Sequence, residues 1–77
     1  MEPQVVIYTK EENQECERLV SLLNHVGREY MEYVQGEDYT EVEFRSEFGE
    51  GAEYPQVAVG YSHIGGLKDF LSYLKCS

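Results

Sequence analysis

The residues that could act as nucleophiles or soft metal ligands are two cysteines, Cys16 and Cys76, and two histidines, His25 and His63. The histidines stand apart from each other and from the cysteines, so the ligand spacing of a zinc site is missing and no metal is expected. Two cysteines are too few for a disulfide framework, and reduced thiols are expected in the cytoplasm. The place of each cysteine in the fold therefore decides whether the chain can perform thiol chemistry.

Composition narrows the class of protein. The 77 residues include 6 Lys and Arg against 15 Asp and Glu, which gives a formal charge of -9. This excess of acid argues against binding nucleic acid through phosphates or binding an anionic membrane surface. With 42% hydrophobic and 13% aromatic residues, the chain is too apolar for a disordered acidic tail. We expect one domain, residues 1–77, and no membrane partner.

The first third of the chain predicts a strand followed by a helix. A β-branched run over Gln4–Tyr8 is typical of a buried strand and is far too short for a signal sequence or a membrane span, so a cytoplasmic protein is expected. Asn13 has the character of a helix N-cap, and Gly27 stands where a left-handed C-terminal cap is expected. Between them, apolar residues recur at helical spacing. They are Cys16, Leu19, Val20, Leu23 and Val26.

The remaining segments alternate in the same orderly way. Strands are predicted over Arg28–Val34, Gln56–Gly60 and Tyr61–Ile64, with a helix over Tyr39–Phe48. A last helix is predicted from the spacing of Leu67, Phe70, Leu71 and Leu74. The order β-α-β-α-β-β-α implies a parallel first pair of strands, because of its crossover, and an antiparallel hairpin at the end. The expected architecture is an α/β sandwich with a mixed four-stranded sheet flanked by helices.

Several segments together resemble the glutaredoxins, a family of the thioredoxin superfamily. The matching segments follow in order and spacing: the strand end Val5-Val6-Ile7-Tyr8-Thr9-Lys10, the helix Glu17–Leu23, the turn at residues 27–30, Tyr54-Pro55-Gln56-Val57 and His63-Ile64-Gly65-Gly66. The match covers nearly the whole chain, and its compact length is similar to bacterial and phage members. The resemblance implies the thioredoxin-like fold and glutathione-linked thiol-disulfide exchange, with no resident cofactor and with glutathione as ligand or co-substrate.

The chain departs from this family at the position of the nucleophile. Glutaredoxins carry Cys-x-x-Cys or Cys-x-x-Ser there, whereas this chain has Asn13-Gln14-Glu15-Cys16. Disulfide exchange needs a thiolate, and the start of a helix lowers the pKa of such a thiol. An asparagine cannot attack sulfur, but its side-chain oxygen can cap the helix. Asn13 therefore keeps the helix start capped but removes the nucleophile of thiol-disulfide exchange. The same replacement removes the cysteine that ligates iron–sulfur clusters in some members of the family.

Cys16 is the remaining candidate catalytic residue. It falls on the apolar face of the predicted helix, where burial raises the pKa of a thiol and blocks access to it. Nearby Glu12, Glu15 and Glu17 also disfavour a thiolate. We expect Cys16 to be a small buried hydrophobic residue, and we expect Cys76 to be exposed at the chain end and incidental.

The glutathione or peptide site implied by the resemblance is only partly preserved. Pro55 matches the cis-proline, and the preceding Tyr54 would offer backbone groups to a bound peptide, as in strand addition. Lys10 matches the residue that binds the glutathione carboxylate. The loop Gly65-Gly66-Leu67 matches the segment near the γ-glutamyl end. At position 68 the family usually has a polar or acidic residue, whereas this chain has Lys68 followed by Asp69, and Asp69 is a candidate substitute.

Three functions stay open at this stage. The first is a redox-deficient glutaredoxin-like binding module for glutathione or a thiol client, which we expect to be monomeric. The second is an oxidoreductase that uses Cys16 as its only thiol. The third is an acidic interaction protein for a basic partner, although a solvated surface explains the same charges.

The acidic residues behind the third function gather in one stretch, in which Arg45 is the only base. They are Glu29, Glu32, Glu37, Asp38, Glu41, Glu43, Glu47, Glu50 and Glu53. These acids are expected to repel an anionic thiol such as glutathione.

Overall fold

The computed structural model describes residues 4–76, with side chains to residue 75. Its elements follow the predicted order. They are β1 (Val5–Thr9), α1 (Gln14–His25), β2 (Tyr30–Val34), α2 (Glu41–Phe48), β3 (Gln56–Val59), β4 (Ser62–Gly65) and α3 (Leu67–Cys76). None of the helices among these residues is long and apolar enough to cross a lipid bilayer.

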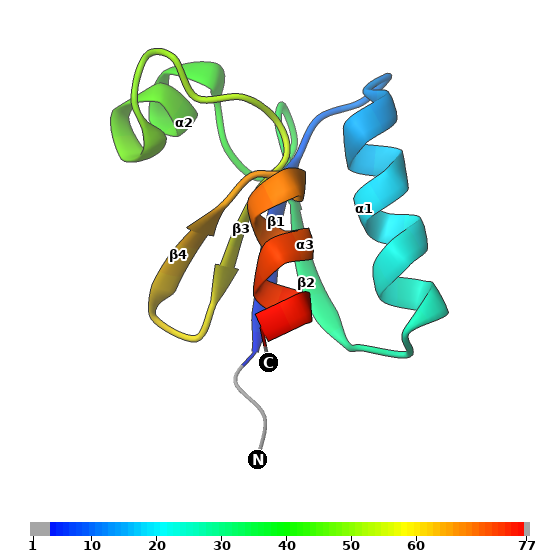
Figure 1. The fold of residues 1–77 in the computed structure, drawn as a ribbon. Coiled ribbons are helices and arrows are strands. Elements are labelled where there is room, and N and C mark those ends of the chain that lie inside the picture. Colours follow the sequence, from blue (N-terminus) through cyan, green and yellow to red (C-terminus); the bar gives the residue numbers. More distant parts are fainter. Residues whose placement is uncertain (1–3, 77) are drawn as a thin grey trace.

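The four strands form one mixed sheet in the order β2-β1-β3-β4 (Figure 1). Strand β1 runs parallel to β2, with Val5 opposite Tyr30. It runs antiparallel to β3, with Val5 opposite Val59, and β3 pairs with β4 as an antiparallel hairpin. The parallel crossover and the closing hairpin are both as predicted, and the α/β sandwich is confirmed.

Helix α1 begins and ends where its sequence signals stand. The Asn13 backbone is extended, and its side-chain Oδ1 accepts a hydrogen bond from the Cys16 N–H at 2.9 Å. At the other end Gly27 has a φ of 71°, which glycine adopts without steric cost. The N–H of Arg28 donates to the carbonyl of Leu23 at 3.0 Å, and the N–H of Gly27 donates to that of Asn24 at 3.2 Å. These paired bonds form a Schellman cap, so both predicted helix ends are confirmed.

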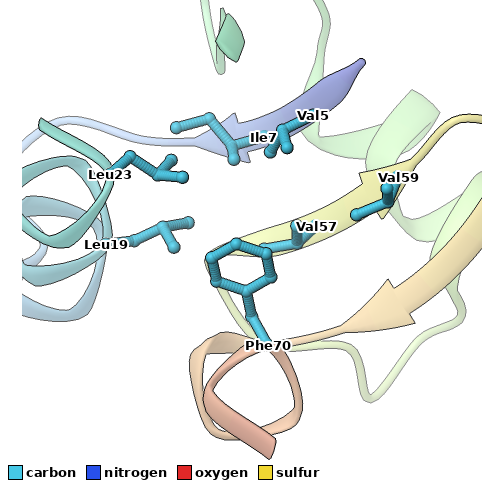
Figure 2. Close-up of a cluster of buried hydrophobic side chains, with 7 residues drawn as sticks. All are labelled: Val5, Ile7, Leu19, Leu23, Val57, Val59 and Phe70. Carbon is cyan, nitrogen blue, oxygen red and sulfur yellow. The ribbon is translucent and has the colours of Figure 1, made fainter. Parts of the chain in front are cut away.

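The main core lies between the sheet and the two helices that cover one face of it, α1 and α3 (Figure 1). Figure 2 shows its seven buried side chains, which converge from both strands and helices. They are Val5, Ile7, Leu19, Leu23, Val57, Val59 and Phe70. This is the packing role that was expected of the apolar positions, because removing such side chains from water is the main driving force for folding.

Two residues expected on buried helix faces are exposed. Val26 is 50% exposed because it is the C-cap residue, beyond the last turn of α1. Leu71 is 41% exposed. It lies about 100° around α3 from Phe70, which points into the core. Both helices have the predicted spacing of apolar residues, but the buried face of each is narrower than predicted.

Helix α2 lies beyond one end of the sheet, near the end of β1 and the start of β3 (Figure 1). It begins at Glu41, later than predicted, because Thr40 forms a capping box with Glu43: the Glu43 N–H donates to the Thr40 hydroxyl at 3.1 Å, and the Thr40 N–H donates to the Glu43 carboxylate at 2.9 Å. The helix contributes Phe44 to a second buried cluster with Cys16 and Tyr54. This smaller, aromatic core supports the part of the molecule where the predicted site residues meet.

Candidate functional site

A groove runs between the start of α1, the loop that precedes β3 and the start of α3. Eight of the ten residues predicted for the site line it, namely Lys10, Asn13, Tyr54, Pro55, Gly66, Leu67, Lys68 and Asp69. Six lining residues were not predicted, namely Glu15, Arg45, Gly51, Ala52, Glu53 and Gln56. Cys16 and Gly65 are not part of the lining.

Asn13 occupies the end of the groove at the helix start, where its amide is used for capping. Its Oδ1 accepts from the Cys16 N–H at 2.9 Å, and its carbonyl accepts from the Glu17 N–H at 3.1 Å. The side chain is half-buried. An amide held in this way offers no nucleophile and no titratable proton to a molecule in the groove.

Cys16 is buried behind Asn13, and its free thiol is only 4% exposed. Burial is the main cause that raises the pKa of the thiol, and the charges of Glu32 and Glu15 raise it further. Lys10 opposes these effects through its backbone hydrogen bond and its charge. Burial was expected from the sequence, whereas the part played by Glu32 was not. Both the geometry and the pKa keep Cys16 in the thiol form.

Cys16 also borders a second surface hollow, which shares Lys10 with the groove. There the Thr9 hydroxyl donates to the Glu32 carboxylate at 2.8 Å. Thr9 is buried and Glu32 is exposed, so the bond ties the end of β1 to β2. Cys16 therefore contacts Lys10 and Asn13, as the predicted grouping requires, but it does not line the groove itself. The side chain of Cys76, expected to be exposed, lies outside the described part of the chain.

Tyr54 builds the wall of the groove next to Pro55, and the peptide bond between them is cis. The Tyr54 ring stacks on Phe44, with centroids 4.0 Å apart and planes inclined by 11°. On the groove side the Lys10 Nζ lies 4.9 Å from the centroid of the same ring, a cation–π contact. Tyr54 thus holds Lys10 at the groove and also fills the space beside Cys16.

The tyrosine hydroxyls of this region are buried together. The Tyr39 hydroxyl donates to the Thr9 carbonyl at 2.6 Å. The buried Tyr54 hydroxyl lies near the Tyr39 hydroxyl, whose proximity lowers the pKa of Tyr54 in part, but it makes no hydrogen bond of ordinary geometry among the described residues. Burial is the main cause that raises the pKa of both phenols above the ordinary value. Neither hydroxyl is therefore a base at neutral pH.

Two hydrogen bonds of the Gln56 side chain fix the loop that carries Tyr54 and Pro55. The Gln56 Nε2 donates to the Glu53 carbonyl at 2.7 Å, and its Oε1 lies 2.6 Å from the His63 Nε2. Because that oxygen can only accept, His63 carries its proton on Nε2. The sequence offered no signal for the contact between Gln56 and His63, since these residues meet only through the β3–β4 hairpin.

Arg45 fixes the opposite wall. Its Nη1 donates to the carbonyls of Glu50 at 2.8 Å and Ala52 at 2.7 Å, and its Nη2 pairs with Glu41 at 3.0 Å. The guanidinium therefore closes the turn that follows α2. In sequence Arg45 was notable only as the one base within the acidic stretch.

The glycine loop approaches both the cis-proline and the start of α3. A Cβ on Gly66 would lie 3.5 Å from the Pro55 carbonyl oxygen. Gly65 has a φ of 127°, and a Cβ there would collide with the Asp69 carboxylate. That carboxylate accepts from the Gly66 N–H at 3.2 Å. Asp69 is thus engaged in capping its own helix, and Gly65 permits the close approach.

The distribution of charge differs from the expectation that acids would dominate the site. Three of the six Lys and Arg line the groove, together with three of the fifteen Asp and Glu. The groove is therefore neutral, and the formal charge of -9 belongs to residues outside it. The acids of residues 29–53 are mostly directed elsewhere. In the described part of the chain, no group of three or more His, Cys, Asp and Glu side chains is arranged to hold a metal ion.

Solved structures with a similar fold include several glutaredoxins. Glutaredoxin 1 from Francisella tularensis, complexed with cacodylate, matches with a TM-score of 0.81 at 18% identity over 95% of this chain and 93% of that chain. A buckwheat glutaredoxin–glutathione complex matches with a TM-score of 0.78 at 22% identity, over 96% of this chain and 70% of that chain. Glutaredoxin from Brucella melitensis matches with a TM-score of 0.74 at 26% identity, over 99% of this chain and 83% of that chain. No protein-family model and no curated protein sequence matches the chain.

Proposed function

Because the chain has the glutaredoxin fold of the thioredoxin superfamily, we propose that it is a redox-deficient member of that superfamily which binds glutathione or a thiol peptide without exchanging disulfides. The observation that carries the proposal is the hydrogen bond from the Cys16 N–H to Asn13 Oδ1. It puts a capping amide at the helix start, beside a groove that keeps Lys10, Pro55 and Gly66. Binding would take place in the cytoplasm and would need no resident cofactor.

The backbone beside Pro55 supports recognition of an extended peptide. Tyr54 lies outside β3, and no backbone hydrogen bond among the described residues uses its N–H or C=O. A peptide that lies antiparallel to this segment would satisfy both groups, as in the addition of a strand to a sheet edge. This recognition depends on main-chain atoms and does not need a nucleophilic cysteine.

A binding experiment tests the first half of the proposal. Reduced glutathione is titrated into the ¹⁵N-labelled protein, and amide chemical shifts are followed. We expect shifts at Lys10, Tyr54 and Gly66, which line the groove, and none at Gly27 or Gly60, which lie elsewhere. Absence of any shift at millimolar glutathione would refute binding in the groove.

An activity assay tests the second half. The wild type should not accelerate the glutathione-coupled reduction of a mixed disulfide above the uncatalysed rate, because Asn13 provides no thiolate. Asn13→Cys should gain turnover, since its thiolate would attack the disulfide at a helix start next to Lys10. Asn13→Ser is the matched control, because it keeps a capping oxygen and adds no thiol. Wild-type turnover like that of an ordinary glutaredoxin would contradict the proposal.

The same assay separates the monothiol alternative. If Cys16 were the redox residue, Cys16→Ser would abolish whatever turnover the wild type shows. Its 4% exposure and its raised pKa both oppose this function. We therefore expect wild type and Cys16→Ser to be indistinguishable from the uncatalysed reaction.

A further inference from the structure

Within the described residues, three of the six charged side chains of the groove are already paired, and Glu53, on the loop before β3, is not among them. Arg45 is engaged with Glu41 and two carbonyls. Asp69 accepts from the Gly66 N–H, and Glu15 lies 3.8 Å from Arg18. These groups are not free to select a ligand without first giving up a partner.

Lys68 differs from them. It lines the groove at the first turn of α3, it is exposed, and no hydrogen bond or ion pair within the described residues engages its ammonium. Lys10, which lines the same groove, is held against the Tyr54 ring. The α3 end of the groove therefore has an available positive charge, and the nearest acid in sequence, Asp69, is committed to its own helix.

We propose that Lys68 makes the groove selective for the charge of the ligand end that lies against α3, favouring an end with a carboxylate and no ammonium. The inference rests on the proposed function, because it concerns the same groove. A lysine ammonium attracts a carboxylate and repels a second ammonium, and the start of a helix also favours negative charge. The preferred ligand class is an extended thiol peptide whose amino group at that end is blocked.

The acids elsewhere on the protein do not cancel this selectivity. Charges further away than about 10 Å are largely screened at 0.1 M salt. The groove itself contains as many cations as acids. At the α3 end the Asp69 carboxylate accepts from the Gly66 N–H, whereas the Lys68 ammonium has no partner within the described residues, so we expect Lys68 to set the preference there. The overall charge of -9 lowers the affinity for all anionic ligands without distinguishing their ends.

The test uses two redox-inert probes, S-methylglutathione and N-acetyl-S-methylglutathione. The dissociation constant of each probe is measured from the amide chemical shifts during a titration. The wild type should bind the acetylated probe about two- to fivefold more tightly, as fits one exposed ion pair. Lys68→Gln should remove the preference, and Lys68→Asp should reverse it. Lys75→Asp is the matched control, because it makes the same charge change on α3 outside the groove and should leave the preference intact.

The outcomes separate this inference from the function on which it rests. Equal affinity of the wild type for both probes, or an unchanged preference in Lys68→Asp, would overturn the role of Lys68 and leave groove binding established. If neither probe shifts the groove amides, groove binding itself fails, and the selectivity falls with it. Amide spectra of each variant show whether it has kept the fold.

Discussion

The rings of Phe44 and Tyr54 stack in parallel 4.0 Å apart, and the Cys16 thiol is buried in the same cluster. The pair joins α2 to the loop before the cis-proline. It also covers the one thiol that the helix start retains. Aromatic packing of this kind excludes water, so the local environment favours the neutral forms of the thiol and the phenols.

Cys16 should react slowly with alkylating reagents while the protein is folded. In a Cys76→Ser background it is the only thiol, and at pH 8 we expect iodoacetamide to modify it at least about tenfold more slowly than a free cysteine, because burial raises its pKa and hides it. Mass spectrometry over time measures the rate. Denaturation in urea should restore the ordinary rate. Fast modification of the folded protein would show that the aromatic cluster opens or leaves the thiol accessible.

Stability should decline in alkaline solution. Burial raises the folded-state pKa of Cys16, Tyr39 and Tyr54, so the unfolded chain ionises first, near its ordinary values of about 8.5 for Cys and 10 for Tyr. The unfolded state then binds fewer protons, and the free energy of unfolding falls as pH rises. Urea titrations from pH 7 to 11 should show a flat region followed by this fall. Tyr39→Phe should make the fall less steep, whereas an identical slope would contradict the assignment.

Asn13 should contribute to stability as a cap. Asn13→Ala leaves the Cys16 N–H without its acceptor, and we expect the free energy of unfolding to fall by about 1 kcal/mol. Asn13→Asp keeps an acceptor oxygen and should change it by no more than a few tenths. Chemical denaturation monitored by circular dichroism measures both. Equal effects of the two substitutions would mean that the hydrogen bond is not what position 13 contributes.

Arg45 should be worth more to stability than an ordinary surface arginine. Its side chain is 31% exposed and donates to the carbonyls of Glu50 and Ala52. Arg45→Ala should cost about 2 kcal/mol, since hydrogen bonds from charged donors are stronger than neutral ones. Arg18→Ala is the control, because that side chain is 70% exposed and its ion pair at 3.8 Å should contribute about 0–0.5 kcal/mol. If Arg45→Ala lowered the free energy of unfolding as little as Arg18→Ala does, the carbonyl contacts of Arg45 would not contribute to stability.

Gly65 should not tolerate a methyl group. Gly65→Ala would place a Cβ against the Asp69 carboxylate at a φ of 127°, and we expect a loss of about 2 kcal/mol. Adding Asp69→Ala should recover only part of it, because the unfavourable φ remains. Gly51→Ala, which meets no atom within 4 Å, is the control and should be nearly neutral. Full recovery in the double variant would show that the clash alone matters.

Predictions from the sequence succeeded where the cause is local. The cap at Asn13 and the Schellman turn at Gly27 each depend on neighbours within a few residues. The alternation of apolar residues gave the order of strands and helices, and the crossover rule gave the pairing of β1 with β2. Eight of the ten residues predicted for the site also line one groove, although the fold and not a local cause brings them there, and their part in binding stays a prediction.

The misses depend on distance through space. Gln56 reaches His63 only because β3 and β4 pair, and Lys10 reaches Tyr54 only because β1 lies beside the start of β3. Val26 and Leu71 have helical spacing but are exposed, because Val26 lies beyond the last turn of α1 and Leu71 lies about 100° around α3 from the buried Phe70. Cys16 lies next to Asn13 in the helix but borders a different hollow.

The sequence alone therefore determined the elements, their order and the substitution of a capping amide for the nucleophile, because periodicity and helix caps act over one or two turns. Only the tertiary structure decided which charges share the groove, which of them are already paired and which, like Lys68, have no partner within the described residues. Electrostatic attraction depends on separation in space, and the fold sets that separation between residues far apart in the chain.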